Sequence, residues 1–124
     1  QAWVYDKFSK TLFTSDMFTY AVSDNENGPW ILEEDDLVCG IQFIKSFMLN
    51  TRYWWLEGAK TRVLRENIRR IFNEYDITTI APGYGKIFRG RELVAKQFDK
   101  LDTIMADFDF SKNKAQYIAR NHLR

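Results

Sequence analysis

Histidine and cysteine, the side chains that most often bind transition metals, are almost missing from this chain of 124 residues. There is one histidine, His122, and one cysteine, Cys39. A single cysteine excludes an intrachain disulfide, which fits a reducing cytoplasm. Because a two-metal centre needs a cluster of ligands, we expect that this chain cannot build one from its own residues.

An excess of charge of one sign is also lacking. The sequence holds 18 Lys and Arg against 17 Asp and Glu, a formal net charge of +1. This balance gives no electrostatic reason to expect nucleic acid or an anionic membrane as a partner. No apolar run approaches the ~20 residues that span a bilayer, and the start has no signal-peptide pattern. We therefore expect a cytoplasmic protein with no nucleic-acid and no membrane partner.

Hydrophobic residues, in contrast, are plentiful. They make up 45% of the chain, and aromatic residues make up 16%. That is enough apolar material for a packed core, so disorder is excluded. The chain opens on Gln1 and already has the character of a strand at Trp3-Val4-Tyr5. We expect that its start has been cut, and that residues 1–124 form a single partial domain.

Periodicity and turn residues predict the order of the elements. Short aromatic or β-branched runs separated by a polar turn predict a hairpin, and apolar residues spaced three and four apart predict helices. A short charge-free run that stops at a Gly-rich turn predicts a buried strand. The expected elements are, in chain order, a hairpin of residues 3–5 and 11–14, a loop at 24–29, helices at about 33–50 and 59–75, a strand at 77–81, a helix from about 90 to 108, and a short helical tail.

This order, strand-strand-helix-helix-strand-helix, predicts an α/β fold in which helices cover a sheet. A sheet of three strands has open edges, and its second face has no cover. A missing N-terminal half or a second copy of the chain would solve both problems. We therefore predict that the chain either forms a homo-oligomer, namely a dimer, or binds the missing N-terminal half.

Two segments have the features of a functional site. One is the strand that ends in Asp16, and the other is the strand that ends in the turn Pro82-Gly83-Tyr84-Gly85. Side chains at strand ends of α/β folds point into the crevice where ligands bind, and glycines let a ligand approach the backbone closely. In the simpler alternative, Asp16 caps a turn and Tyr84 packs over one.

The same two segments resemble a known family. LFTSDMF, residues 12–18, resembles the segment of metallo-β-lactamase-fold proteins in which a strand-end aspartate bridges two metal ions. TIAPGYGKIFRG, residues 79–90, is similar to the later segment that carries a metal-binding histidine. The likeness runs from about Trp3 to Leu101 and is greatest to the flavodiiron and oxygen-binding diiron branch. It implies the C-terminal half of an αββα metallo-β-lactamase-like sandwich.

The resemblance also implies roles for single residues. Asp16 falls on the bridging aspartate, and Tyr84 falls on the histidine. A phenol is protonated at neutral pH, with a pKa near ~10, and is a poor ligand for zinc or ferrous iron, although a phenolate can bind ferric iron. The implied cofactor is di-iron in the complete parent protein, with zinc as the alternative, and none is expected for this chain alone.

The function implied by the resemblance is that of a fragment. The parent would be a diiron protein that binds or reduces dioxygen, and this chain would be inactive alone because most metal ligands are missing. The parent would be an oxidoreductase or a metallohydrolase, while this chain alone would not be an enzyme. Two alternatives stay open: a degenerate, non-catalytic binding or dimerisation module of the same fold, and a fragment of a di-zinc metallohydrolase.

Overall fold

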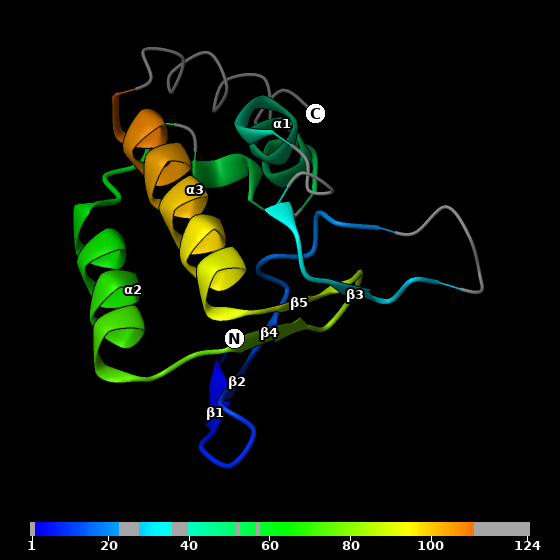
Figure 1. Cartoon of the computed structure of the whole chain (residues 1–124). Coiled ribbons are helices and arrows are strands. Elements are labelled where there is room, and N and C mark those ends of the chain that lie inside the picture. Colours follow the sequence, from blue (N-terminus) through cyan, green and yellow to red (C-terminus); the bar gives the residue numbers. More distant parts are fainter. Residues whose placement is uncertain (1, 23–27, 36–39, 52, 57, 111–124) are drawn as a thin grey trace.

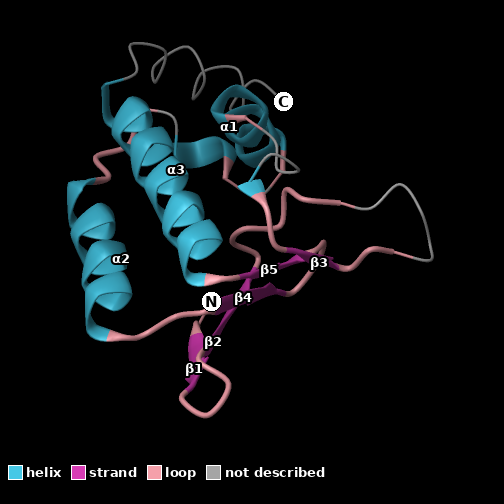
Figure 2. Ribbon diagram, viewed as in Figure 1, coloured by secondary structure: helices cyan, strands magenta, loops and turns pink. Residues whose placement is uncertain are grey.

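The fold is a mixed five-stranded sheet with its α-helices on one side, as the computed structural model shows in Figures 1 and 2. The structure describes residues 2–22, 28–35, 40–51, 53–56 and 58–110. The expected α/β class is confirmed. The finer expectation of a metallo-β-lactamase half-sandwich is not confirmed by this arrangement.

The strand order in the sheet is β1-β2-β4-β5-β3. The strands are β1 (Val4–Asp6), β2 (Thr11–Ser15), β3 (Ile31–Leu32), β4 (Thr79–Pro82) and β5 (Ile87–Arg89). β1 and β2 form an antiparallel hairpin, and β4 and β5 form another antiparallel pair. β2 and β4 are parallel, as are β3 and β5. The two parallel pairs bring distant parts of the chain together.

In the described part of the chain, three α-helices and the 3-10 helix η2 accompany this sheet. They are α1 (Ile41–Asn50), the 3-10 helix η2 (Trp54–Leu56), α2 (Arg62–Glu74) and α3 (Arg91–Phe110). α3 contacts β4 and β5 and also both other α-helices, so it lies at the centre of the helical layer (Figure 1).

The core lies between α3 and one face of the sheet. Leu12, Ile80, Phe88 and Leu32 pair across neighbouring strands, and each is at most 2% exposed. Side chains alternate between the two faces of a strand, so these four form one continuous row under the helices. Full burial of such a side chain contributes roughly 1.5–3 kcal/mol, which makes this row a main source of stability.

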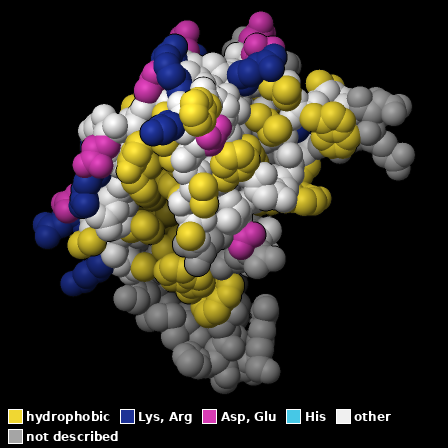
Figure 3. Space-filling view, turned by 90° about the horizontal axis from the view of Figure 1, so that it is seen from below, with side chains coloured by type: hydrophobic (Ala, Val, Ile, Leu, Met, Phe, Trp, Pro, Cys, Tyr) yellow, Lys and Arg dark blue, Asp and Glu magenta, His cyan; other side chains and the backbone are white. Residues whose placement is uncertain are grey.

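The opposite face of the sheet carries a second apolar row, which we call the outer row. It has one member on each strand, next to the core residue of that strand: Val4 pairs with Phe13 and Phe13 with Ala81, while Ile87 pairs with Ile31. Exposure is 59% for Val4, 46% for Phe13 and 38% for Ile31. Hydrophobic side chains are visible on the surface of the molecule when it is seen from below (Figure 3). Within the described part of the chain, the helices pack on the other face.

The observed elements agree with the predicted ones in the hairpin and differ in two strands and in the start of the first helix. The predicted hairpin is confirmed, but the strands β3 and β5 were not predicted. The first predicted helix begins at Ile41 and not near residue 33; Leu37 and Val38 lie outside the described residues, as do Cys39 and the tail with His122.

The second predicted helix is also shorter than expected. α2 spans Arg62–Glu74, and the apolar side chain of Val63 in its first turn is 65% exposed. Ile68 is the buried residue of this helix. Val63 lies about 140° around the helix axis from Ile68, which explains its exposure.

Candidate functional site

The C-terminal ends of β2 and β4 lie side by side, because these strands are parallel neighbours. Ser15 pairs with Pro82, and the Gly83 N–H donates a hydrogen bond of 2.7 Å to the Ser15 carbonyl oxygen. Asp16 directly follows β2, and Tyr84 follows β4. The fold therefore brings together the two strand ends that carry the sequence-predicted residues.

The loop after β2 has an unusual backbone. Ser15 and Phe18 have φ angles of 52° and 65°, in the left-handed region that non-glycine residues rarely adopt. The fully buried Thr14 stabilises the loop, since its Oγ1 donates to the Met17 carbonyl oxygen at 2.8 Å. Such conformations persist where the surroundings fix them and often lie at functional sites.

The turn after β4 packs against the end of that loop. Gly85 has a φ of +84°, and a Cβ at this position would lie 2.7 Å from the Ala21 carbonyl oxygen. The Lys86 N–H donates to the same oxygen at 2.6 Å. The close approach requires glycine here, so the two loops form one interlocked unit.

The side chains of Asp16 and Tyr84 lie in different surroundings. Asp16 is half-buried and borders a cavity of about 10 Å3, which is room for about one water molecule. Tyr84 is 68% exposed and is not among the residues that line this cavity. Proximity of the strand ends therefore does not by itself create a site for a substrate.

A metal centre needs more donors than these two residues provide. Among the described residues, no group of three or more His, Cys, Asp and Glu side chains lies close enough to hold a metal ion. The described residues therefore do not fit a di-metal centre on their own. The metal-binding roles of Asp16 and Tyr84 stay predictions.

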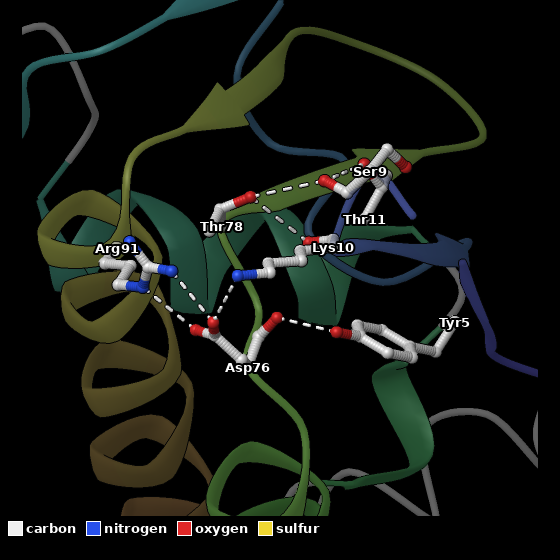
Figure 4. Close-up of polar contacts among 7 residues, drawn as sticks. All are labelled: Tyr5, Ser9, Lys10, Thr11, Asp76, Thr78 and Arg91. Atoms are coloured by element: carbon white, nitrogen blue, oxygen red, sulfur yellow. Dashed lines mark hydrogen bonds and ion pairs between the residues drawn. The ribbon is translucent and has the colours of Figure 1, made fainter. Parts of the chain in front are cut away.

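A polar cluster at the other end of β4 ties the hairpin to the helical layer (Figure 4). Arg91 donates two hydrogen bonds to the Asp76 carboxylate, at 2.9 and 2.8 Å, and Lys10 pairs with it at 3.0 Å. The Tyr5 hydroxyl donates to the Asp76 backbone oxygen at 2.7 Å. Arg91 and then Lys10 hold the pKa of Asp76 well below its usual range. All three charged side chains are partly exposed, so the cluster joins elements and does not form a binding pocket.

A second polar network crosses the core at Gln97, which is fully buried on α3. The Tyr20 hydroxyl donates to Gln97 Oε1, and Gln97 Nε2 donates to Asp35 at 2.9 Å. Lys100 also donates to Asp35 at 2.9 Å. Although burial raises the pKa of Asp35, the hydrogen bonds from Lys100 and Gln97 lower it below its ordinary value. The network joins α3 to the segments that contain Tyr20 and Asp35.

Gln97 was missed in the sequence. One signal was present, because Gln97 lies three residues after Val94 and four before Leu101, on the apolar face of its helix. A polar residue on such a face predicts a buried hydrogen bond, because an unpaired buried amide is costly.

Comparisons with known proteins add one structural relative. No family model matches the sequence, and no curated protein matches it. A solved structure, the apo state of the chemotaxis sensor ODP from T. denticola, matches with a TM-score of 0.51 and 18% sequence identity. The chain shares its fold with that sensor. The match covers 95% of this chain but 41% of the sensor chain, so the chain spans less than half the length of that relative.

These findings correct the sequence-based assignment to a diiron metallo-β-lactamase-fold protein. The structural relative is described as a chemotaxis sensor, and no family model supports the diiron branch or the metallohydrolase alternative. The expected metal-binding character is corrected as well, because the described residues contain no group of three or more His, Cys, Asp and Glu side chains that could hold a metal ion. The motifs were misleading because a Gly-rich turn after a strand also allows two loops to pack closely, as Gly83 and Gly85 do here.

In the described ranges, every helix is too short or too polar to cross a bilayer.

Proposed function

We propose that this chain is a non-catalytic interaction module of a sensory protein, and that it acts by packing its outer row against a second layer of polypeptide. The observation that supports this most strongly is the outer row itself, which crosses all five strands of the sheet. The likeness in fold to a chemotaxis sensor supports a sensory role.

The size of this face fits a sheet-on-sheet contact. Neighbouring strands lie about 4.8 Å apart, so the four spacings between five strands give a row roughly 19 Å wide. Val4, Phe13 and Ile31 each leave between 38% and 59% of their surface exposed. Covering them fully contributes roughly 1 kcal/mol each, half of the usual value for complete burial. An exposed apolar face of this kind marks an interaction site.

The second layer is either another copy of the chain or the N-terminal half of the same protein. Only 41% of the sensor's length matches this chain, which supports a parent protein with further polypeptide. If two copies pack their outer rows together at the ~30° angle of aligned sheets, each copy covers the exposed sheet face of the other. We place this protein in the cytoplasm as part of the same proposal, in keeping with its lone cysteine.

Light scattering after size-exclusion chromatography tests the proposal. The wild-type chain is expected to associate as its concentration rises from about 10 µM to 500 µM, the range of weak protein contacts. Phe13→Lys places a charge in the outer row and shifts the chain to a monomer. Phe8→Lys is the matched control, because Phe8 is 91% exposed in the hairpin turn and lies outside the row.

A longer chain that includes the preceding residues distinguishes the two candidates for the second layer, which are a second copy and the N-terminal half. If the N-terminal half covers the sheet, that longer chain is a monomer, and its β2 and β4 amides exchange more slowly than in the short chain. A short chain that stays monomeric, combined with no gain of protection in the longer chain, refutes the docking of the outer row.

A further inference from the structure

An open apolar groove lies on the helical side of the molecule, between α2 and the N-terminal segments. Its volume is about 360 Å3, and it is lined by Trp3, Met17, Leu64, Asn67, Ile68 and Ile71. Hydrophobic side chains surround a hollow beside the charged surface of α2 in Figure 3. Ligand pockets usually measure about 300–1,000 Å3, so this groove is large enough for a small molecule.

The groove has a fixed aromatic wall and an apolar floor. The Trp3 ring packs against Phe18, with ring centroids 6.0 Å apart, and meets Phe98 edge-on at 6.4 Å. Met17 and Ile68 are each 7% exposed and form the floor. Because these contacts hold Trp3 in place without a ligand, binding would need little rearrangement.

A cation, Arg70, is hydrogen-bonded to one of the residues that line the groove. Arg70 Nη2 donates to Asn67 Oδ1 at 2.7 Å, so the guanidinium lies beside a groove-lining residue. Within the described residues, Arg70 forms no ion pair, whereas Arg65 and Arg69 of the same helix both pair with Asp102. The guanidinium therefore retains donors for an anion, and its planar group suits a carboxylate.

We propose that this groove binds a small apolar carboxylate. Its ring or short alkyl chain lies between Trp3 and Leu64, and its carboxylate accepts hydrogen bonds from Arg70. The site is on the opposite side of the sheet from the outer row, so it is independent of the proposed docking of that row. In a sensory protein it would supply the ligand-responsive element.

Calorimetry with a matched pair of probes tests this site. The probes are 2-naphthoate and the neutral 2-naphthylmethanol, which share the ring system and differ in charge. At low salt, naphthoate is expected to bind about two- to five-fold more tightly, the value of one partly exposed ion pair. Arg70→Gln removes this difference. Arg62→Gln is the control and retains it, because the Arg62 side chain is 82% exposed and pairs with Glu66.

A second variant tests the apolar part of the groove. Leu64 is 38% exposed, so Leu64→Gln leaves the core intact and should weaken both probes alike. Phe13→Lys should leave naphthoate binding unchanged, which keeps this result separate from the behaviour of the outer row. The inference is overturned if naphthoate fails to bind at millimolar concentration, if Arg70→Gln and Arg62→Gln have the same effect, or if Leu64→Gln changes neither affinity.

Discussion

The substitution Gly85→Ala tests whether the loops after β2 and β4 are interlocked. Gly85 has a φ of +84°, and its added Cβ would lie 2.7 Å from the Ala21 carbonyl oxygen and 3.2 Å from that of Thr19. Both obstacles are backbone atoms, which cannot turn away as the end of a flexible side chain does. The turn must move, and the Lys86 to Ala21 hydrogen bond of 2.6 Å is lost with that movement.

Three contributions set the size of the effect. A left-handed conformation costs alanine roughly 1–2 kcal/mol. Loss of the backbone hydrogen bond costs about 1 kcal/mol. The smaller conformational freedom of unfolded alanine offsets roughly 0.4–1 kcal/mol. The free energy of unfolding should therefore fall by about 2 kcal/mol, which for a chain of this size lowers Tm by roughly 8 °C.

Urea unfolding followed by circular dichroism measures this change, with Gly90→Ala as the control. Gly90 also has a positive φ, +118°, but its Cβ would meet no atom within 4 Å. It should therefore show only the cost of its positive φ, with neither a clash nor the loss of the Lys86 to Ala21 hydrogen bond. Equal losses of stability in the two variants would show that the turn does not contact residues 19–21 in solution.

Three further predictions concern the core and the polar networks. Phe88→Ala, at a residue with 0% exposure, should lower the free energy of unfolding by roughly 3–5 kcal/mol; a loss below about 1 kcal/mol in urea titration would contradict the proposed core row. Gln97→Leu removes the acceptor of the Tyr20 hydroxyl and should cost about 1–3 kcal/mol by the same measurement, whereas an unchanged midpoint would exclude the buried network. The pKa of Asp76 in the folded protein lies below its ordinary value of 3.8, so its stabilising contribution is fully present above that pH and is lost as the pH falls through the folded-state pKa. Asp76→Asn should therefore reduce the acid dependence of the urea midpoint between about pH 4 and pH 2, and identical slopes for wild type and variant would refute the pairing with Arg91.

Much of the fold was predictable because its longest elements have strong local patterns. The hairpin and the helix α3 carry alternating or three-and-four spacings of apolar residues over their full length. β3 has two residues and β5 has three, which is too short for a period of two to be recognised. Their pairing with each other depends on residues 56 positions apart, as in Ile31 with Ile87, and no local pattern records such a distance.

The candidate site was predictable only in part, for a related reason. Strand ends that lie side by side could be inferred from two strands followed by turn residues, and the structure places them together. The groove is different, because Trp3, Met17 and α2 meet there from three separate parts of the chain. Its cation was predictable as part of a basic helix face, but sequence alone did not separate Arg70 from the paired Arg65 and Arg69.

The sheet order has a consequence for how the chain is made. β4 lies between β2 and β5, so among the described strands the β1–β2 hairpin gains its neighbour only when residues 79–82 have been synthesised. A two-stranded hairpin is at best marginally stable in water. On the ribosome, the 63 residues 16–78 must emerge after β2 before β4 can pair with it, and helper proteins that bind exposed apolar segments would find the hairpin accessible during that interval.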